Sequence, residues 1–494
     1  MMPQETLAIW FGNHHASHPA LNHHLEIEVA VVGGGIMGLT AALELAEAGK
    51  KVALFERRYL GSSETGHTTA HVTARPETRL AELIKHVGTG GVTEIWQAMN
   101  AGLNYISKRA TEFQISSARV DAWQMGRRGT LESELEVLQM LGASAKISKP
   151  PAPLMGKQAL CLFDQMRFDV AQYLRALTER AEKLGVLIFE KSTVSEGKDN
   201  QLEVHTETGI WQLKASKTIL ATGAPMFASP ILLDRIRADQ SYAIAVAVAA
   251  GAAPDVLAED DENPYHYYRL EPGIARGHPQ EDIVIFGGED HKTGREATTD
   301  RFEALELTLK QWLPNVDYRL VRRWSGEIWT STDGLPLIGE DQKGRFFGTA
   351  FAGVGMTQGT LAALMAVDWV FDRTSPWSEV FSSSRFSPLE LPGIVQQGIG
   401  FVTQLVKTVL PQKLPTESLQ AGEGALVSID GQPSAAYRDL SGTLYLFDPK
   451  CSHAGCEVHW NQADSTWDCG CHGSRFTAGG EVRSGVAPKA LTPR

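Results

Sequence analysis

Ile27-Glu-Val-Ala-Val-Val-Gly33-Gly-Gly35-Ile-Met-Gly38 is the stretch of this sequence that decides the fold of its larger part. The apolar run before the glycines predicts a buried β-strand, and the apolar residues after them predict a helix that ends at Gly49. A second short strand, residues 52–55, closes with Glu56. A G-x-G-x-x-G turn between a strand and a helix, followed by an acidic residue at the next strand's end, is typical of dinucleotide binding.

The three glycines of this turn have separate roles in binding a dinucleotide. Gly33 permits the tight turn, Gly35 lets the backbone approach a pyrophosphate, and Gly38 allows the helix to pack closely on the strand. The helix N-terminus offers N–H donors and a positive dipole end to the phosphates. Glu56, with Arg57 beside it, is placed to accept hydrogen bonds from ribose hydroxyls.

No second fingerprint of this kind occurs, which argues against a reductase that binds two nucleotides, and the next two turns favour FAD over NAD. Residues 218–223 form a predicted strand that ends in a small-residue turn, which lets the chain pass close beneath a dinucleotide. A glycine-dense turn at 348–359 precedes a helix predicted from Thr360, so a second helix N-terminus can face the electron-rich flavin pyrimidine edge. The residues predicted to contact FAD in these two turns are Ala221, Gly223, Gly353, Gly355, Met356 and Thr357.

Two short loops near the end of the chain alternate cysteine and histidine. Cys451-Ser-His453 and Cys469-Gly-Cys-His472 supply two thiolates and two imidazoles, which suit a [2Fe–2S] cluster of the Rieske type. Tetrahedral zinc is the alternative, although zinc sites favour C-x2-C or H-x3–5-H pairs. Gly473 and Ser474 also fit backbone and hydroxyl donors aimed at cluster sulfurs.

Composition narrows the class of protein. The 494 residues have room for two or three domains, and 43% apolar with 21% charged residues is ordinary for a globular protein. The net charge of −12 argues against nucleic acid or an anionic membrane surface as a partner. No apolar run of about eighteen residues predicts a membrane span, and no secretion signal is evident. We therefore expect a cytoplasmic protein.

With these motifs in view, the first 390 residues resemble the D-amino-acid oxidase and glycine oxidase type of FAD-dependent oxidoreductase, and the whole chain resembles the bacterial subgroup that appends a Rieske domain. Further matching marks lie at residues 61–71, 287–294, 323–325 and 351–359. The resemblance implies an α/β (α+β) FAD-binding Rossmann-type domain with an interleaved antiparallel β substrate domain, plus a small all-β C-terminal Rieske domain. We expect an N-terminal segment (1–25), the oxidoreductase (26–390), a linker helix (391–420) that docks on it, and the Rieske domain (421–494).

The same resemblance assigns the other two cysteines of the loops. Cys456 and Cys471 stand where a Rieske domain has a clamping disulfide. Gly470 replaces a common proline, and Phe476 replaces the tyrosine whose hydroxyl bonds a ligand sulfur in high-potential members. Loss of that hydrogen bond predicts an intermediate reduction potential.

Family resemblance also places residues along the flavin. Residues 61–73 are expected to line flavin and pyrophosphate, with His67 and Thr68 among them. His67 lies near a histidine that some relatives bond covalently to the flavin, but the preceding tryptophan is missing, so a non-covalent contact is favoured. Val194 stands where relatives bind adenine through a backbone pair.

For the substrate, family members hold a carboxylate with a tyrosine and an arginine, a bidentate task for guanidinium. Tyr268 and Arg269, on a predicted strand at 265–270, are the candidates, with Arg323 as an alternative; a surface strand with a salt-bridged arginine is an equal interpretation. His291 could move protons near the flavin, although a structural histidine is favoured.

The leading functional hypothesis is an amino-acid or secondary-amine dehydrogenase. It passes a hydride from a small-molecule substrate to the flavin, and electrons then leave singly through the cluster to an external one-electron acceptor, with slow oxygen reactivity. A second hypothesis reverses the flow, so that a partner protein reduces the flavin through the cluster. A third is a redox sensor or electron-transfer module without turnover.

Overall fold

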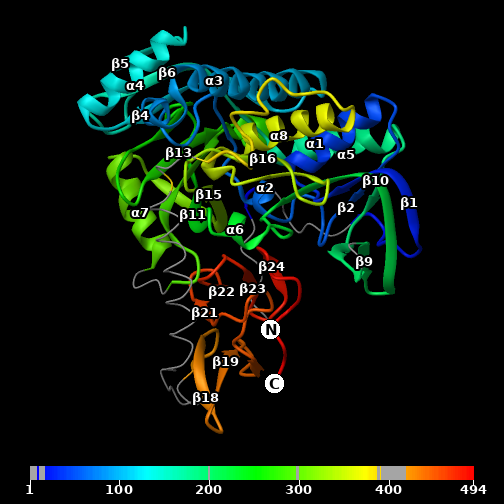
Figure 1. Cartoon of the computed structure of the whole chain (residues 1–494). Coiled ribbons are helices and arrows are strands. Elements are labelled where there is room, and N and C mark those ends of the chain that lie inside the picture. The colour runs from blue at the N-terminus through cyan, green and yellow to red at the C-terminus, as the bar shows by residue number, and fades with distance from the viewer. Residues whose placement is uncertain (1–7, 11–16, 199–200, 296–299, 387–389, 391–418) are drawn as a thin grey trace.

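The computed structural model of the chain describes residues 8–10, 17–198, 201–295, 300–386, 390 and 419–494. Two large sheets and their helices form the upper body in Figure 1, and the C-terminal strands, coloured orange to red, form a smaller lobe below it. The linker helix predicted within 391–420 lies almost wholly outside the described residues, so its docking and the proposed domain limits stay predictions.

The first sheet contains the dinucleotide-binding fold that the glycine turn predicted. β1 (Leu25–Val32) lies between β2 (Val52–Phe55) and β10 (Gly209–Gly223), and both neighbours run parallel to it. The order is β16-β17-β10-β1-β2-β7, with β16 (Leu337–Glu340), β17 (Phe346–Thr349) and β7 (Leu187–Phe189), while β8 (Thr193–Glu196) and β9 (Leu202–Thr206) extend it. Helices α1 (Ile36–Glu47), α5 (Val170–Lys183) and α8 (Gly355–Val370) pack together beside it.

Apolar composition explains why this layer is buried. Val29, Val31 and Leu39 are fully buried, as is Leu54 of β2, because helices cover the parallel sheet. α8 begins at Gly355, five residues before the predicted start at Thr360. Gly355 and Gly359 therefore belong to the start of the helix. Close packing on α1 favours glycine at 359, because a Cβ there would lie 2.9 Å from Ile36 Cγ2.

The second sheet is the interleaved, mostly antiparallel β layer expected of the substrate domain. Its order is β15-β11-β14-β13-β12-β4-β6-β3, with β5 (Ala145–Ser148) paired to β6. The strands are β15 (Tyr318–Ser331), β11 (Ile236–Ala249), β14 (Glu281–Lys292), β13 (His266–Glu271), β12 (Leu257–Glu259), β4 (Ser117–Met125), β6 (Ala159–Phe168) and β3 (His71–Val72). Helices α3 (Leu80–Glu112), α4 (Arg128–Met140) and α7 (Arg301–Trp312) lie in the same body.

The C-terminal lobe is all-β, as predicted. One antiparallel sheet has the order β18 (Gly424–Ile429), β19 (Gln432–Arg438), β20 (Leu444–Phe447). The other has the order β21 (Val458–Asn461), β22 (Thr466–Cys469), β23 (Arg475–Thr477), β24 (Val482–Ser484). Among the described helices, none is long and apolar enough to cross a membrane.

Candidate functional site

The glycine turn after β1 is crowded by backbone. Gly33 has φ +115°, and a Cβ there would overlap the carbonyl oxygen of Ala221, where β10 passes beneath the turn. A Cβ on Gly38 would overlap the Gly33 carbonyl, and one on Gly35 would lie 2.8 Å from Thr65 Oγ1. Only glycine allows the strand end, the turn and the helix start to meet this closely, so the three predicted roles have a geometric basis.

Two helix N-termini open into one cavity. Gly35, Ile36 and Met37 border the cavity at the start of α1, and residues 353–356 border it at the start of α8. Neither helix has an acidic residue in its first turn or a side-chain cap. The Ile36 N–H at the start of α1 donates to Thr65 Oγ1 at 3.1 Å. Two positive dipole ends face the same space, which fits the pyrophosphate and the pyrimidine edge of FAD.

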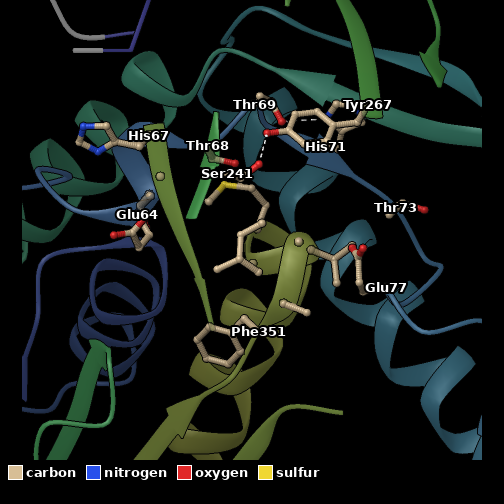
Figure 2. A pocket seen from close by; sticks show the side chains of 18 of the residues that line it. Glu64, His67, Thr68, Thr69, His71, Thr73, Glu77, Ser241, Tyr267 and Phe351 are labelled. Atoms are coloured by element: carbon tan, nitrogen blue, oxygen red, sulfur yellow. Dashed lines mark hydrogen bonds between the residues drawn. The ribbon is translucent and has the colours of Figure 1, made fainter. Parts of the chain in front are cut away.

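The cavity extends from these helix ends to the second sheet. Figure 2 shows Glu64 and His67 on one side and Thr73 and Glu77 on the other, with Tyr267 between them at the sheet. Of the predicted flavin residues, those that border the cavity are Gly35, His67, Thr68, Ala221, Gly223, Gly353, Gly355 and Met356. His67 Nδ1 lies 2.9 Å from the Ser63 carbonyl oxygen. Whether its ring bonds the flavin covalently stays a prediction.

The remaining predicted flavin residues lie around the cavity rather than in its wall. The Glu56 carboxylate accepts from Gly34 N at 2.8 Å, which fixes the turn. Arg57 is enclosed by protein, and burial lowers its pKa. Thr357 Oγ1 donates to the Thr73 carbonyl at 3.0 Å, and Val194 is buried in β8, opposite Val204 of β9. Ribose and adenine contacts of Glu56 and Val194 stay predictions.

A polar group of side chains forms the end of the cavity nearest β13. Arg75, Glu77, Glu259, Tyr265 and Tyr267 line it. Arg75 forms an ion pair with Glu259, and its Nη1 is buried without a hydrogen-bond partner among the described residues. The Glu77 side chain is exposed to the cavity, but protein encloses the site on all other sides. This burial, followed by the negative charge of Glu259, raises the pKa of Glu77 to about 7. Tyr267 Oη lies 3.0 Å from Ser241 Oγ.

The predicted substrate residues Tyr268 and Arg269 do not border this cavity. Tyr268 is fully buried on the other face of β13 and donates to the Pro254 carbonyl at 2.8 Å. Arg269 is also fully buried: its Nη1 donates to the Thr69 and Ala70 carbonyls, both at 3.1 Å, and its Nη2 pairs with Glu271. Adjacent strand residues point to opposite faces, so these two could not have served one carboxylate together.

The two other substrate-side candidates also lie elsewhere. Arg323 is partly exposed and pairs with Glu306 at 2.5 Å, so it is a salt-bridged arginine on a surface strand. His291 Nε2 lies 3.0 Å from Tyr242 Oη, its Nδ1 lies 3.0 Å from the Lys292 carbonyl, and burial lowers its pKa. It therefore has a structural place away from the cavity.

Both cluster loops come together at one end of the C-terminal lobe. Cys456 and Cys471 form the predicted disulfide. Cys451 and Cys469 are buried free thiols that hydrogen-bond each other, and the rings of His453 and His472 lie 4.9 Å apart between centroids.

Donors surround the two free thiols. Backbone N–H groups of residues 453 and 454 point at Cys451, and those of residues 471 and 472 point at Cys469. The buried hydroxyl of Ser474 lies close to Cys451 and helps to lower the pKa of its thiol. Two adjacent thiols and two adjacent imidazoles, with donors aimed at the sulfurs, fit a [2Fe–2S] cluster with cysteines on one iron and histidines on the other.

Comparison with known families agrees with both sites. A model of FAD-dependent oxidoreductases matches residues 28–369, which is more than half of the chain. The chain belongs to this family. A model of the Rieske [2Fe-2S] domain matches residues 412–493, so the two cofactors are FAD and a [2Fe–2S] cluster rather than zinc.

Individual relatives share either the whole architecture or the oxidoreductase fold. The chain is 31% identical to the "Putative Rieske 2Fe-2S iron-sulfur protein YhfW" of Bacillus subtilis (strain 168), over 96% of this chain and 94% of that protein. The structure of glycine oxidase from Geobacillus kaustophilus is similar with a TM-score of 0.60 and 18% identity, over 74% of this chain and 100% of that one. That of L-proline dehydrogenase from P. horikoshii has a TM-score of 0.61 and 18% identity, over 74% and 98%.

In this FAD-dependent oxidoreductase, strand β15 joins the cavity to the Rieske domain. Glu327 and Trp329 of β15 line the cavity. The same side chains contact the Rieske domain: Ser484 Oγ donates to Glu327 Oε2 at 3.0 Å, and a Cβ on Gly473 would lie 3.1 Å from Trp329. Gly473 directly follows the cluster ligand His472.

Buried polar groups fasten this contact. Ser325 Oγ of β15 donates to Asp464 Oδ2 at 2.6 Å, and Asp464 is fully buried between Arg475 and Arg483. Asn461 Nδ2 donates to Tyr242 Oη at 3.0 Å. Hydrogen bonds to a buried charge are among the stronger ones, so the Rieske domain is held in a defined position against β15.

Sequence reasoning missed several cavity residues of this oxidoreductase. Arg75 and Glu77 directly follow the stretch 61–73 that was expected to line the flavin, so extending that stretch would have found them. Tyr267 could have been found from strand alternation. Glu64 lies within the stretch 61–73 that was expected to line the flavin, whereas Glu327 carried no sequence signal. Burial raises the pKa of both, and the Glu327 N–H donates to Glu64 across the domain.

Proposed function

We propose that this protein is an FAD-dependent dehydrogenase that oxidises a C–N bond of an amino acid or secondary amine and passes the electrons singly through its Rieske cluster to an external acceptor. Bound FAD would accept a hydride from the substrate and release its electrons one at a time. The residues of the chain bind and orient the substrate and hold the two redox centres in place.

The observation that carries this proposal is the double role of β15. Glu327 and Trp329 belong to the wall of the flavin cavity and also contact the Rieske domain beside the second cluster loop. A cluster domain fastened to the cavity wall by buried hydrogen bonds is suited to exchanging electrons with a group inside that cavity. A simple oxidase that reduces oxygen does not need this second centre.

The polar end of the cavity supports an amino acid or amine as substrate. Among the described residues that line the cavity, Arg75 is the one arginine and no lysine occurs. The Arg75 guanidinium borders the cavity and can attract a substrate carboxylate, and the pair with Glu259 holds the guanidinium in place. Arg75 therefore takes the role first predicted for Arg269.

Tyrosine and carboxylate groups complete this substrate end. Tyr265 and Tyr267 present phenol groups to the same space, with ring centroids 5.7 Å apart, and Glu77 presents a carboxyl group that can face the amine. Burial, then the charge of Arg269, lowers the pKa of the neighbouring His71 to about 4, so this histidine stays neutral at physiological pH. The relatives named glycine oxidase and L-proline dehydrogenase share the fold, which agrees with this substrate class.

The test is anaerobic mixing of the holoprotein with a panel of amino acids and N-methyl amines. We expect one class of compound to bleach the flavin absorbance and then to produce the EPR signal of the reduced cluster. Flavin that stays oxidised with every compound, in protein whose cluster is intact and reducible by dithionite, would contradict the dehydrogenase and favour electron flow from a partner protein inward.

A further inference from the structure

The two histidine ligands of the cluster face different surroundings. The loop of His472 packs against the oxidoreductase body: a Cβ on Gly473 would overlap Ala238, and one on Gly294 would overlap the backbone of Gly470. His453, by contrast, is exposed, as are its neighbours Ser452 and Ala454. One ligand edge of the cluster is therefore covered by the flavin-containing body, while the other is open to solvent.

The exposed edge has a local positive charge. Residues 421–494 contain two lysines, Lys450 and Lys489, and both are exposed. Lys450 directly precedes the ligand Cys451. Ser452 Oγ donates to the Lys489 carbonyl at 2.6 Å, and Lys489 N lies 3.2 Å from the same hydroxyl, so both lysines flank the His453 loop.

Nearby carboxylates do not cancel this charge. Asp448 lies in the same loop, but its carboxylate faces Arg494 at 3.5 Å and accepts from the backbone N–H of Lys450 at 3.2 Å. Glu457 is buried. A chain with a net charge of −12 thus places two ammonium groups, neither of them in an ion pair with a described residue, beside its open cluster edge, which favours an encounter with an acidic surface.

We propose that the cluster is a relay with two separate faces: the His472 side exchanges electrons with the flavin, and the His453 side docks a small acidic one-electron carrier protein over Lys450 and Lys489. This inference rests on the proposed function for the direction of flow. In the outward step the reduced cluster loses one electron and the oxidised metal centre of the carrier gains it; no bond is made or broken. The carrier reaches the cluster while the Rieske domain stays fastened to β15.

The experiment uses the full holoprotein, reduced by dithionite and freed of excess reductant. Stopped-flow absorbance follows oxidation of the cluster by plastocyanin, an acidic one-electron copper protein, and by cytochrome c, a basic one, at low and high salt. The test variant is K450E/K489E. The matched control is K85E/K183E, which makes the same change of net charge at exposed lysines of α3 and α5, far from the Rieske domain in Figure 1.

We expect K450E/K489E to slow oxidation by plastocyanin at least about tenfold at low salt and to speed oxidation by cytochrome c, with both differences from wild type shrinking at high salt. The control pair should match wild type, and the cluster EPR signal should be unchanged in all variants. Equal rates in the test variant and wild type, or an equal loss in the control, would overturn the docking face. Because dithionite supplies the electrons, this result does not depend on whether any amine is a substrate.

Discussion

The contact between Gly473 and the oxidoreductase body gives the sharpest prediction. Gly473 has φ +69°, and an added methyl group would overlap Ala238 and lie 2.6 Å from Glu327 Oε1. Gly455, in the first cluster loop, has nearly the same φ, +73°, but nothing lies within 4 Å of its Cβ position. Gly473→Ala therefore combines backbone strain with a clash between domains, whereas Gly455→Ala has the strain alone.

The two costs can be separated. A left-handed conformation costs an alanine about 1–2 kcal/mol, and both variants carry it. Forcing an extra methyl group into a packed contact costs about 1–3 kcal/mol more, which only Gly473→Ala pays. If this difference weakens docking of the Rieske domain, the docked population relative to the undocked one falls about 5- to 150-fold. We therefore expect flavin-to-cluster electron transfer to be slower in Gly473→Ala than in Gly455→Ala, and to be slower by this full factor once the undocked state is the larger population.

The assay reduces the flavin photochemically under anaerobic conditions and follows the cluster EPR signal after freeze-quenching, so no substrate is needed. Iron content and the dithionite-reduced EPR signal show that the cluster is present in both variants. Gly294→Ala changes a residue outside the cluster loops, and its methyl group would overlap the Gly470 backbone from the oxidoreductase side of the same contact. Transfer in both interface variants as fast as in Gly455→Ala would refute the assignment of this contact as the electron-transfer interface.

Four further outcomes are expected. Arg75→Met should weaken the binding of carboxylate-bearing substrates roughly tenfold or more relative to that of the matching amines, because a charge-assisted hydrogen bond contributes about 1.5–3 kcal/mol. The KM values of both compounds measure this difference. Phe476→Tyr should raise the cluster potential by roughly 20–60 mV in a redox titration, the equivalent of one added hydrogen bond. Burial raises the pKa of Asp290 from 3.8 to about 8, so the folded chain keeps a proton that the unfolded chain releases, and stability falls as pH rises between these values; thermal unfolding of Asp290→Asn should show a shallower fall. Gly38→Ala should lose FAD, since its methyl group would overlap the turn's own carbonyl, while Gly49→Ala, with open space around its Cβ, should keep it; the flavin-to-protein ratio after purification decides.

Sequence alone predicted the parts of the sites that are set by local spacing. The turn Gly33–Gly38 is formed by residues close in the chain, and its steric needs can be satisfied only by glycine at those places. The cluster ligands likewise come from two short loops, so their residue types and spacing already indicate the cofactor. The Cys456–Cys471 disulfide followed from the family resemblance and is present.

Parts that depend on how strands lie against each other could not be predicted as well. Tyr268 and Arg269 are chemically suited to a carboxylate, but strand alternation places their side chains on opposite faces of β13. The Arg269 guanidinium donates to the backbone carbonyls of Thr69 and Ala70 instead. No short sequence motif indicates that side chains of β15 contact the Rieske domain. It arises from contacts between residues more than a hundred positions apart, such as Ser325 with Asp464.

The parallel pairing of β1 with β10 has a consequence for how the protein is made. Leu25 lies beside Leu213, and the second helix end of the flavin cavity starts only at Gly355. During synthesis on the ribosome, the nascent chain must wait for α8 before the FAD pocket can close, and such long-range pairing is slow to form. The docking strand β15 precedes α8 in the chain, so the platform for the Rieske domain is complete before the cluster loops leave the exit tunnel. The order of the elements along the chain therefore allows flavin loading to precede iron–sulfur insertion.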